Sequence, residues 1–171
     1  MNKKPRSFLR TISVIFSFII VLLIFSVLIF SYFFFPIQVN GIAMEPQYKD
    51  QDIWFIRKNT EIRSGNVYVY ESPSGILSMG RVLGSPLEKI LISNCKLYVN
   101  DKIFTPENET CFRNGDFITE GATYTVPDNY YFLVADNAER SKDSRHFGWI
   151  EKEKIKGSPE FKLNIKFSSE N

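Results

Sequence analysis

Two serines, an aspartate and the only histidine of the chain lie within six residues of one another, at Ser141, Asp143, Ser144 and His146. A serine hydroxyl can attack a carbonyl carbon when a histidine takes its proton and a carboxylate orients that histidine, so these are the residue types of a hydrolytic triad. A triad is defined by geometry and by a nearby oxyanion site, and closeness in sequence supplies neither. We therefore expect no triad here, and we expect His146 to be a packed or surface histidine.

Lysine and arginine side chains are the other candidates for acid–base chemistry. An exposed lysine is a poor base at neutral pH because its pKa is about 10.4, and a guanidinium does not deprotonate. We therefore expect Lys89, Lys142 and Arg81 to be solvated surface charges.

The two cysteines, Cys95 and Cys111, leave two states open. A disulfide would persist outside the cell, but the spacing does not show that the Cβ atoms meet, so two buried free thiols remain the alternative. One histidine and no Cys-x-x-Cys pair give a metal site little support. We expect neither a metal nor a cofactor.

The elements that position these residues start with an apolar segment. Residues 11–35 are 25 consecutive residues without a charge, mostly Ile, Phe, Leu and Val. At about 1.5 Å per residue, a helix of this length exceeds the hydrocarbon layer of about 30 Å. The segment is longer than the core of a cleaved signal peptide, which has about 7 to 15 residues, and no small-x-small site follows it. We predict a transmembrane helix over residues 11–35 that Pro36 terminates.

Charge predicts how the chain is oriented in the membrane. Four of the 21 basic residues stand before the apolar segment: Lys3, Lys4, Arg6 and Arg10. The positive-inside rule therefore predicts a cytoplasmic basic tail at residues 1–10 and one extracellular domain at residues 36–171, held at the cell membrane by a single span. That domain keeps 17 basic against 19 acidic residues, which argues against nucleic acid as a partner. Membrane lipid, contacted through the one helix, is the first predicted partner, and the sequence does not indicate an oligomeric state.

Residue types and turn signals predict a mainly β domain. Asn100 and Asp101 favour left-handed backbone conformations, so they predict a tight hairpin turn between two strands. The stretches that are rich in β-branched and aromatic residues and have strand length are 53–57, 67–70, 81–83, 89–92, 96–99, 102–104, 130–134 and 161–166.

Three short stretches follow the apolar segment in order: residues 39–46, VNGIAMEP; residues 80–84, GRVLG, with KLYVN at 96–100; and residues 136–148, DNAERSKDSRHFG. They resemble the sequence boxes of the type I signal peptidases (peptidase family S26), the membrane-anchored serine endopeptidases that remove signal peptides after export. The family patterns are G-x-S-M-x-P, K-R-V-I-G and G-D-N-R-x-x-S-x-D-S-R-x-x-G. Three boxes in this order behind an anchor are a specific signal, and the resemblance covers the whole external domain.

The resemblance implies a fold in which coiled antiparallel β-sheets lie close to the membrane surface behind one N-terminal transmembrane helix. In the family, the equivalents of Ser141 and Asp143 sit beside a catalytic lysine, and the equivalent of Arg145 pairs with the aspartate. We therefore expect Asp143 and Arg145 to form a structural ion pair. A substrate peptide would lie extended in a groove, against a strand edge. The residues that the resemblance places in this groove are Gly41, Ile42, Met44, Pro46, Arg81 and Val82.

Two departures from the family pattern decide the predicted activity. Family members attack the scissile carbonyl with a serine hydroxyl whose proton is removed by a buried, neutral lysine. This chain has Ala43 at the serine position and Gly80 at the lysine position. A methyl group cannot attack a carbonyl, and glycine has no side chain to accept a proton. The resemblance therefore predicts an inactive homologue with a vacated dyad.

Gram-positive pilus loci encode signal-peptidase-like proteins that lack the serine and the lysine and assist the sortase-driven polymerisation of pilins, and this chain resembles them. The resemblance implies a chaperone-like or scaffolding role in pilus assembly, with a pilin or another exported protein, and a sortase, as partners. Two alternatives stay open. The first is an active signal peptidase, which would require Ala43 to be a laboratory substitution and would still leave Gly80 at the lysine position to be explained. An inactive protein could instead regulate secretion by competing with an active paralogue for precursors.

Overall fold

The structure, a computed structural model, describes residues 6–104, 115–137 and 141–163. The chain consists of two compact units, Met1–Phe35 and Pro36–Asn171. Some residues named above lie outside the described residues: Lys3, Lys4, Cys111, residues 138–140 of the third box and residues 164–166 of the last predicted strand.

The first unit contains the helix α1, Arg6–Phe33. Its segment Arg10–Phe33 has 24 residues and contains an 18-residue window with a mean hydropathy of 3.2, so by length and composition it can cross a membrane. The helix ends before residue 35, because Phe34–Gln38 forms the strand β1. The prediction that Pro36 terminates the helix is therefore wrong. Pro36 lies inside β1, where a proline is tolerated because β1 is an edge strand of its sheet.

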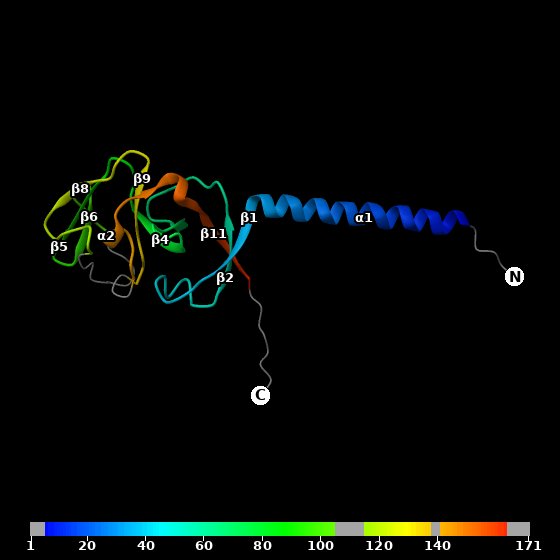
Figure 1. Ribbon diagram of the computed structural model, residues 1–171, viewed down its shortest axis with the longest axis horizontal. Coiled ribbons are helices and arrows are strands. Elements are labelled where there is room, and N and C mark those ends of the chain that lie inside the picture. Colours follow the sequence, from blue (N-terminus) through cyan, green and yellow to red (C-terminus); the bar gives the residue numbers. More distant parts are fainter. Residues whose placement is uncertain (1–5, 105–114, 138–140, 164–171) are drawn as a thin grey trace, which may run out of the picture. The chain divides into compact units, whose positions relative to one another are not determined.

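The second unit is mainly β, as predicted, and its larger sheet has seven strands in the order β1-β2-β11-β3-β4-β9-β10. The pairings from β2 to β10 in this order are antiparallel. In Figure 1, β4 and β9 lie between the end of this unit that carries β2 and the smaller sheet. The strands are β2 Ile53–Arg57, β3 Val67–Glu71, β4 Leu77–Gly84, β9 Tyr130–Val134, β10 Ile150–Glu151 and β11 Ile155–Leu163.

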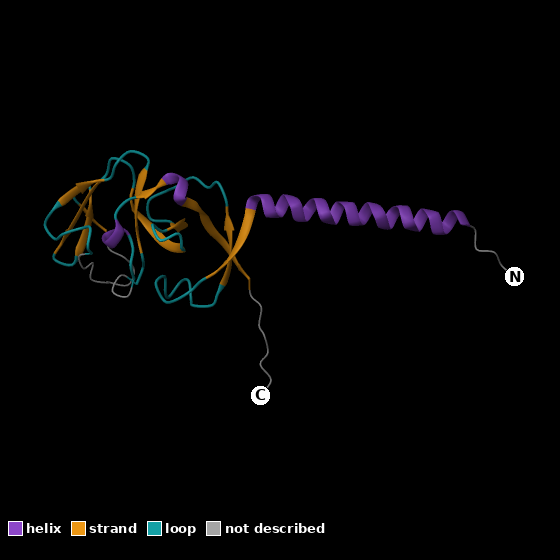
Figure 2. Cartoon of the chain, viewed as in Figure 1, coloured by secondary structure: helices purple, strands orange, loops and turns teal. Residues whose placement is uncertain are grey.

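The smaller sheet has four antiparallel strands in the order β7-β6-β5-β8. They are β5 Lys89–Ser93, β6 Lys96–Val99, β7 Lys102–Phe104 and β8 Thr123–Thr125. The predicted hairpin turn between β6 and β7 is confirmed, since Asn100 and Asp101 adopt φ angles of 49° and 65°. Figure 2 shows that strands dominate this unit, in which the short helical segments are α2 (Ser144–Phe147) and η2 (Lys152–Lys154).

Apolar side chains pack on both faces of the β3–β4 pair, because successive side chains of a strand point to opposite faces. Tyr68 and Tyr70 of β3 belong to one cluster, which includes Leu133 of β9. Val67 belongs to another, against which Ala43 packs. A third cluster joins the two sheets, and its buried members are Leu83, Ile90, Ile92, Leu97, Ile118, Val126, Phe132 and Val134.

Candidate functional site

The predicted nucleophile position, Ala43, lies in the segment between β1 and β2. The backbone N–H of Asn137 donates to the Ala43 carbonyl at 2.8 Å, and the Asn137 side-chain amide donates to the Ile42 carbonyl at 3.2 Å. Ala43 packs against the buried cluster that contains Met44 and Ala135. The first and third sequence boxes are therefore fastened together at this point, although they are far apart in the sequence.

A cavity of about 710 Å³ adjoins Ala43. Its walls are residues 36–44, Tyr70, residues 76–79, Ala135, Ser141 and Lys142. Gly41, Ile42 and Met44 of the predicted groove residues are among them. Residues 77–79 belong to β4 and pair with β3, whereas the register of β4 with β9 begins only at Arg81. Among the described residues, residues 77–79 in the cavity wall therefore pair with a neighbouring strand on one side only.

The predicted base position, Gly80, follows directly on this wall. A Cβ atom at Gly80 would lie 3.1 Å from Cε1 of Tyr70 and 3.2 Å from Cβ of Leu133. These distances are tight, so a side chain could enter only if its neighbours moved by a few tenths of an ångström. The Tyr70 ring lies against the predicted base position at Gly80, and Tyr70 lines the cavity together with Ala43, the predicted nucleophile position.

Pro46, Arg81 and Val82, three predicted groove residues, do not line this cavity. Pro46 is exposed, and Val82 is fully buried in the core. Arg81 is not the solvated charge that we predicted, since its Nε and Nη2 donate to the two carboxylate oxygens of Asp136 at 2.8 and 2.6 Å. The reason is the register of β4 and β9, which places Arg81 opposite Val134, close to the start of the Asp136 segment. Its guanidinium fixes this segment rather than facing solvent.

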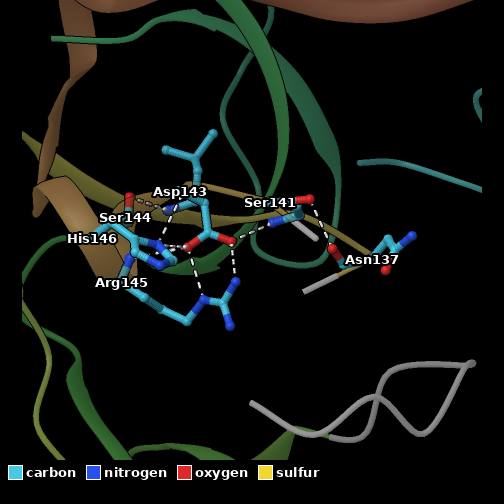
Figure 3. A network of polar contacts seen from close by, with 8 residues as sticks. Asn137, Ser141, Asp143, Ser144, Arg145 and His146 are labelled. Atoms are coloured by element: carbon cyan, nitrogen blue, oxygen red, sulfur yellow. Dashed lines mark hydrogen bonds and ion pairs between the residues drawn. The ribbon is translucent and has the colours of Figure 1, made fainter. Parts of the chain in front are cut away.

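Asp143 and Arg145 form the predicted ion pair, and they form it in the protein interior. The Asp143 carboxylate accepts from Nε and Nη2 of Arg145, each at 2.8 Å, and both side chains are only 1% exposed. It also accepts the backbone N–H groups of Ala135 at 3.1 Å and of Arg145 at 3.0 Å, the second as the N-cap of α2. Figure 3 shows the guanidinium beneath the carboxylate. The pair therefore holds α2 against the end of β9.

The four residues with the composition of a triad are engaged in other contacts. Ser144 Oγ is buried and accepts a backbone N–H of β9 at 3.0 Å, and Ser141 Oγ donates to the Asn137 carbonyl at 2.7 Å. Nδ1 of His146 accepts the backbone N–H of Asp143 at 3.4 Å and is 3.9 Å from Oδ1 of that residue, too far for a hydrogen bond. This is a capping box of α2, visible in Figure 3, and its geometry is not that of a triad.

The electrostatic environment of Tyr70 favours a neutral phenol. Burial raises the pKa of Tyr70 above its ordinary value, and the negative charge of Asp143 raises that pKa further. Lys142, at the rim of the same cavity, is exposed as predicted, and so is Lys89 on the smaller sheet.

Cys95 is disulfide-bonded and exposed, which rules out the alternative of two buried free thiols. It occupies a tight turn between β5 and β6 with a φ angle of 61°, a position at the surface rather than in the core. The other cysteine, Cys111, lies outside the described residues. Among the residues that the structure does describe, no group of three or more His, Cys, Asp or Glu side chains is placed to hold a metal ion.

Sequence patterns did not single out Tyr70 and Asn137 as site residues. Tyr70 ends the predicted strand at 67–70, where every second residue is a tyrosine, and that pattern does not show which residue reaches a cavity. Asn137 belongs to the third sequence box, and this membership was the feature of the sequence that could have indicated a role at the site. Both are brought to the site by the pairing of distant segments.

The sequence matches the family described as signal peptidase, peptidase S26, over residues 11–163. Signal peptidase IB of Staphylococcus aureus is 29% identical to this chain over 149 residues, which cover 75% of this chain and 76% of that protein. Signal peptidase I of Bacillus amyloliquefaciens is 27% identical over 154 residues, covering 84% of this chain and 83% of that protein. A crystal structure of a signal peptidase I from Enterococcus faecalis V583 matches with 24% identity and a TM-score of 0.49, covering 58% of this chain and 97% of that one.

Proposed function

Because the chain belongs to the signal peptidase family, peptidase S26, we propose that it is a membrane-anchored member that binds exported polypeptides without cleaving them. The observation that carries this proposal is the pair of residues at the dyad positions, Ala43 for the serine and Gly80 for the lysine. Neither side chain offers an atom that can attack a carbonyl or accept a proton.

The described residues around the cavity offer no ready substitute for this dyad. Ser144 is buried with its hydroxyl bonded to β9, and Ser141 gives its proton to the Asn137 carbonyl. Lys142 is exposed at the cavity rim, and a solvated lysine is a poor base at neutral pH. Among these residues, no side chain is therefore placed to act as nucleophile or general base in peptide-bond cleavage. Binding a polypeptide requires neither group.

The shape and composition of the cavity support the binding of an extended polypeptide. Residues 77–79 of β4 have β3 on one side, so a bound chain could add as a strand on the other side. Ile76 and Leu77, at the cavity wall, are 65% and 48% exposed. Covering such apolar side chains favours a partner with an apolar segment, such as a precursor that still carries its signal peptide. Without a nucleophile, this groove would hold the chain and release it intact.

We place α1 across the cell membrane, residues 1–10 in the cytoplasm and the β unit outside the cell, because the basic residues precede the apolar helix. The resemblance to the non-catalytic proteins of pilus loci supports a finer assignment. In it, the protein is a chaperone-like scaffold that holds a pilin precursor, or another exported protein, for a sortase during covalent pilus assembly.

Removal of signal peptides is the second candidate, and the names of the relatives, signal peptidase I and signal peptidase IB, favour it. A cleavage assay separates the two candidates. The full-length protein in detergent is incubated with a preprotein that carries an Ala-x-Ala site. We expect no product, because neither dyad group is present. Specific cleavage by the natural chain would overturn the proposal.

Matched variants show whether the fold still accepts a substrate. Ala43→Ser and Gly80→Lys each restore half of the dyad, so we expect both single variants to be as inactive as the natural chain. Product from the double variant would show that the groove still accepts a substrate and lacks only the catalytic dyad.

For the finer assignment, a purified pilin precursor should be retained by the immobilised full-length protein. A regulator would instead slow cleavage by an active signal peptidase added to the same detergent solution.

A further inference from the structure

Tyr70 brings a hydroxyl group to the cavity at the place where the dyad is missing. The residue lies on β3, opposite Ser78 of β4, and its ring edge would be 3.1 Å from a Cβ atom at Gly80. The side chain is 1% exposed, yet it forms part of the cavity wall together with Ala43 and Ser141. What little of Tyr70 is accessible therefore faces the cavity.

The Tyr70 hydroxyl has no hydrogen-bond partner among the described residues, and it is not one of the fully buried unpartnered atoms, which are Trp54 Nε1 and Thr60 Oγ1. The hydroxyl of a largely buried tyrosine normally has a partner. Tyr68, on the same strand, follows the normal pattern and donates to the Glu61 carbonyl at 2.8 Å. Two other polar side chains of the cavity wall are already engaged: Ser141 donates to a backbone carbonyl, and the Gln38 amide donates to the Gln51 side chain at 2.7 Å. Tyr70 is thus a residue of the cavity wall whose hydroxyl is a donor without a partner among the described residues, and this hydroxyl is not a fully buried atom.

We propose that the Tyr70 hydroxyl donates a hydrogen bond to a backbone carbonyl of the polypeptide bound in this cavity, and so positions a chain that is held and not cleaved. The inference rests on the proposed function. A polypeptide lying along residues 77–79 would pass beside Tyr70, because Tyr70 faces Ser78 in the register. Its carbonyl oxygens are the acceptors that an extended chain presents at regular intervals.

The protonation state of Tyr70 fits a donor. Burial and the charge of Asp143 both raise the pKa of the phenol, so the neutral form persists to higher pH than for an exposed tyrosine. The Asp143 carboxylate is itself bonded to Arg145 and to backbone N–H groups, which leaves the phenolic proton free for a ligand. A neutral phenol is a poor nucleophile, so this contact binds a carbonyl without starting cleavage.

Tyr70→Phe tests the inference, because it removes the hydroxyl and keeps the ring beside Gly80. The full-length protein in detergent is titrated with a fluorescein-labelled synthetic peptide that has a leucine-rich core followed by Ala-Gln-Ala. We expect Tyr70→Phe to weaken binding roughly 3- to 10-fold, the loss of one hydrogen bond. Tyr130→Phe, which removes an exposed hydroxyl bonded to Glu151 on β10, is the matched control and should bind like the natural chain.

Two further readouts separate binding from structure. The thermal midpoint of Tyr70→Phe without peptide should be unchanged or higher, because the lost hydroxyl had no partner. In a series of peptides with an ester in place of each amide near Ala-Gln-Ala, one ester should weaken binding to the natural chain but not to Tyr70→Phe, since an ester carbonyl is the weaker acceptor.

Each outcome decides the question. If the natural chain binds the peptide and Tyr70→Phe binds it equally well, the inference is wrong and the proposed function stands. A lowered thermal midpoint of Tyr70→Phe would show that the hydroxyl is bonded within the protein, which also overturns the inference. If the natural chain cleaves the peptide or fails to bind it, the proposed function and the inference fall together.

Discussion

Among single residues, Asp143 and Arg145 show that part of the third sequence box has a structural role. The Asp143 carboxylate caps α2, binds the Arg145 guanidinium and accepts an N–H at the end of β9. Each of these contacts stabilises the fold and needs no neighbouring serine or lysine. The third sequence box can therefore be kept for structural reasons, whether or not Ala43 and Gly80 occupy the dyad positions, as we propose.

We expect Arg145→Met to lower the free energy of unfolding by about 3 to 5 kcal/mol, because it leaves a buried carboxylate without its counter-charge. The measurement is urea unfolding of the full-length protein in detergent, followed by tryptophan fluorescence. Arg57→Met is the matched control. Arg57 pairs with Glu160 at 3.6 Å with both side chains largely exposed, so its loss should change the unfolding free energy by about 0.5 kcal/mol or less. Equal effects of the two substitutions would contradict the structural role of the buried pair.

Among the elements, β11 holds the larger sheet together because it pairs with two strands in turn. Its first residues face β3 and its later residues face β2, and the register shifts at both Gly157 and Pro159. Gly157 has a φ angle of 152°, and a Cβ atom there would collide with the Arg57 carbonyl. The crossing from one partner strand to the other therefore requires a residue without a side chain.

Gly157→Ala should consequently lower the free energy of unfolding by more than about 3 kcal/mol, since backbone atoms of β2 and β11 would have to separate. Gly75→Ala provides the comparison. Gly75 has a φ angle of 79° but no heavy atom within 4 Å of a Cβ, so only the backbone strain of about 1 to 2 kcal/mol remains. The same urea titration measures both. A loss at Gly157 no larger than that at Gly75 would show that the crossing is not close-packed.

Strands with dense β-branched and aromatic residues could be predicted from the sequence, and β2, β6, β7 and β9 have the predicted bounds. The strands that composition does not mark depend on their partners. β4 begins at Leu77 because β3 pairs with it, although serine, methionine and glycine follow. β11 runs through Gly157 and Pro159, two residues that usually interrupt strands, and both lie where the register shifts.

The candidate site was predictable where motifs define it and not where distant pairing does. Through the resemblance of the three boxes to the family patterns, the sequence indicated Ala43, Gly80 and the Asp143–Arg145 pair. They did not indicate that Arg81 would be bound by Asp136, which follows from the register between β4 and β9. The hydroxyl of Tyr70 at the cavity likewise depends on which face of β3 is covered, a consequence of packing that no local pattern encodes.

For the whole molecule, the proposed membrane anchor α1 determines which partners the β unit would encounter. A domain tethered to a membrane encounters other membrane-bound chains at a raised effective concentration, so even weak binding to a precursor can be sufficient. The same proposed anchor would restrict the β unit to one side of the membrane. A role in the assembly of exported proteins thus depends on the orientation of α1 as much as on the cavity.

The orientation can be tested with protease on intact protoplasts that express the full chain with an N-terminal and a C-terminal epitope tag. Because the four basic residues Lys3, Lys4, Arg6 and Arg10 resist transfer across the membrane, we expect the C-terminal tag to be digested and the N-terminal tag to be protected. Replacing all four by glutamine should reduce the protected fraction. Replacing Lys89 and Lys102, which are far from the apolar segment in the sequence, should not reduce the protected fraction. Digestion of the N-terminal tag from outside would place the β unit in the cytoplasm, where neither a signal peptide after export nor a pilin awaiting a sortase is present, and would remove the basis for the proposed function.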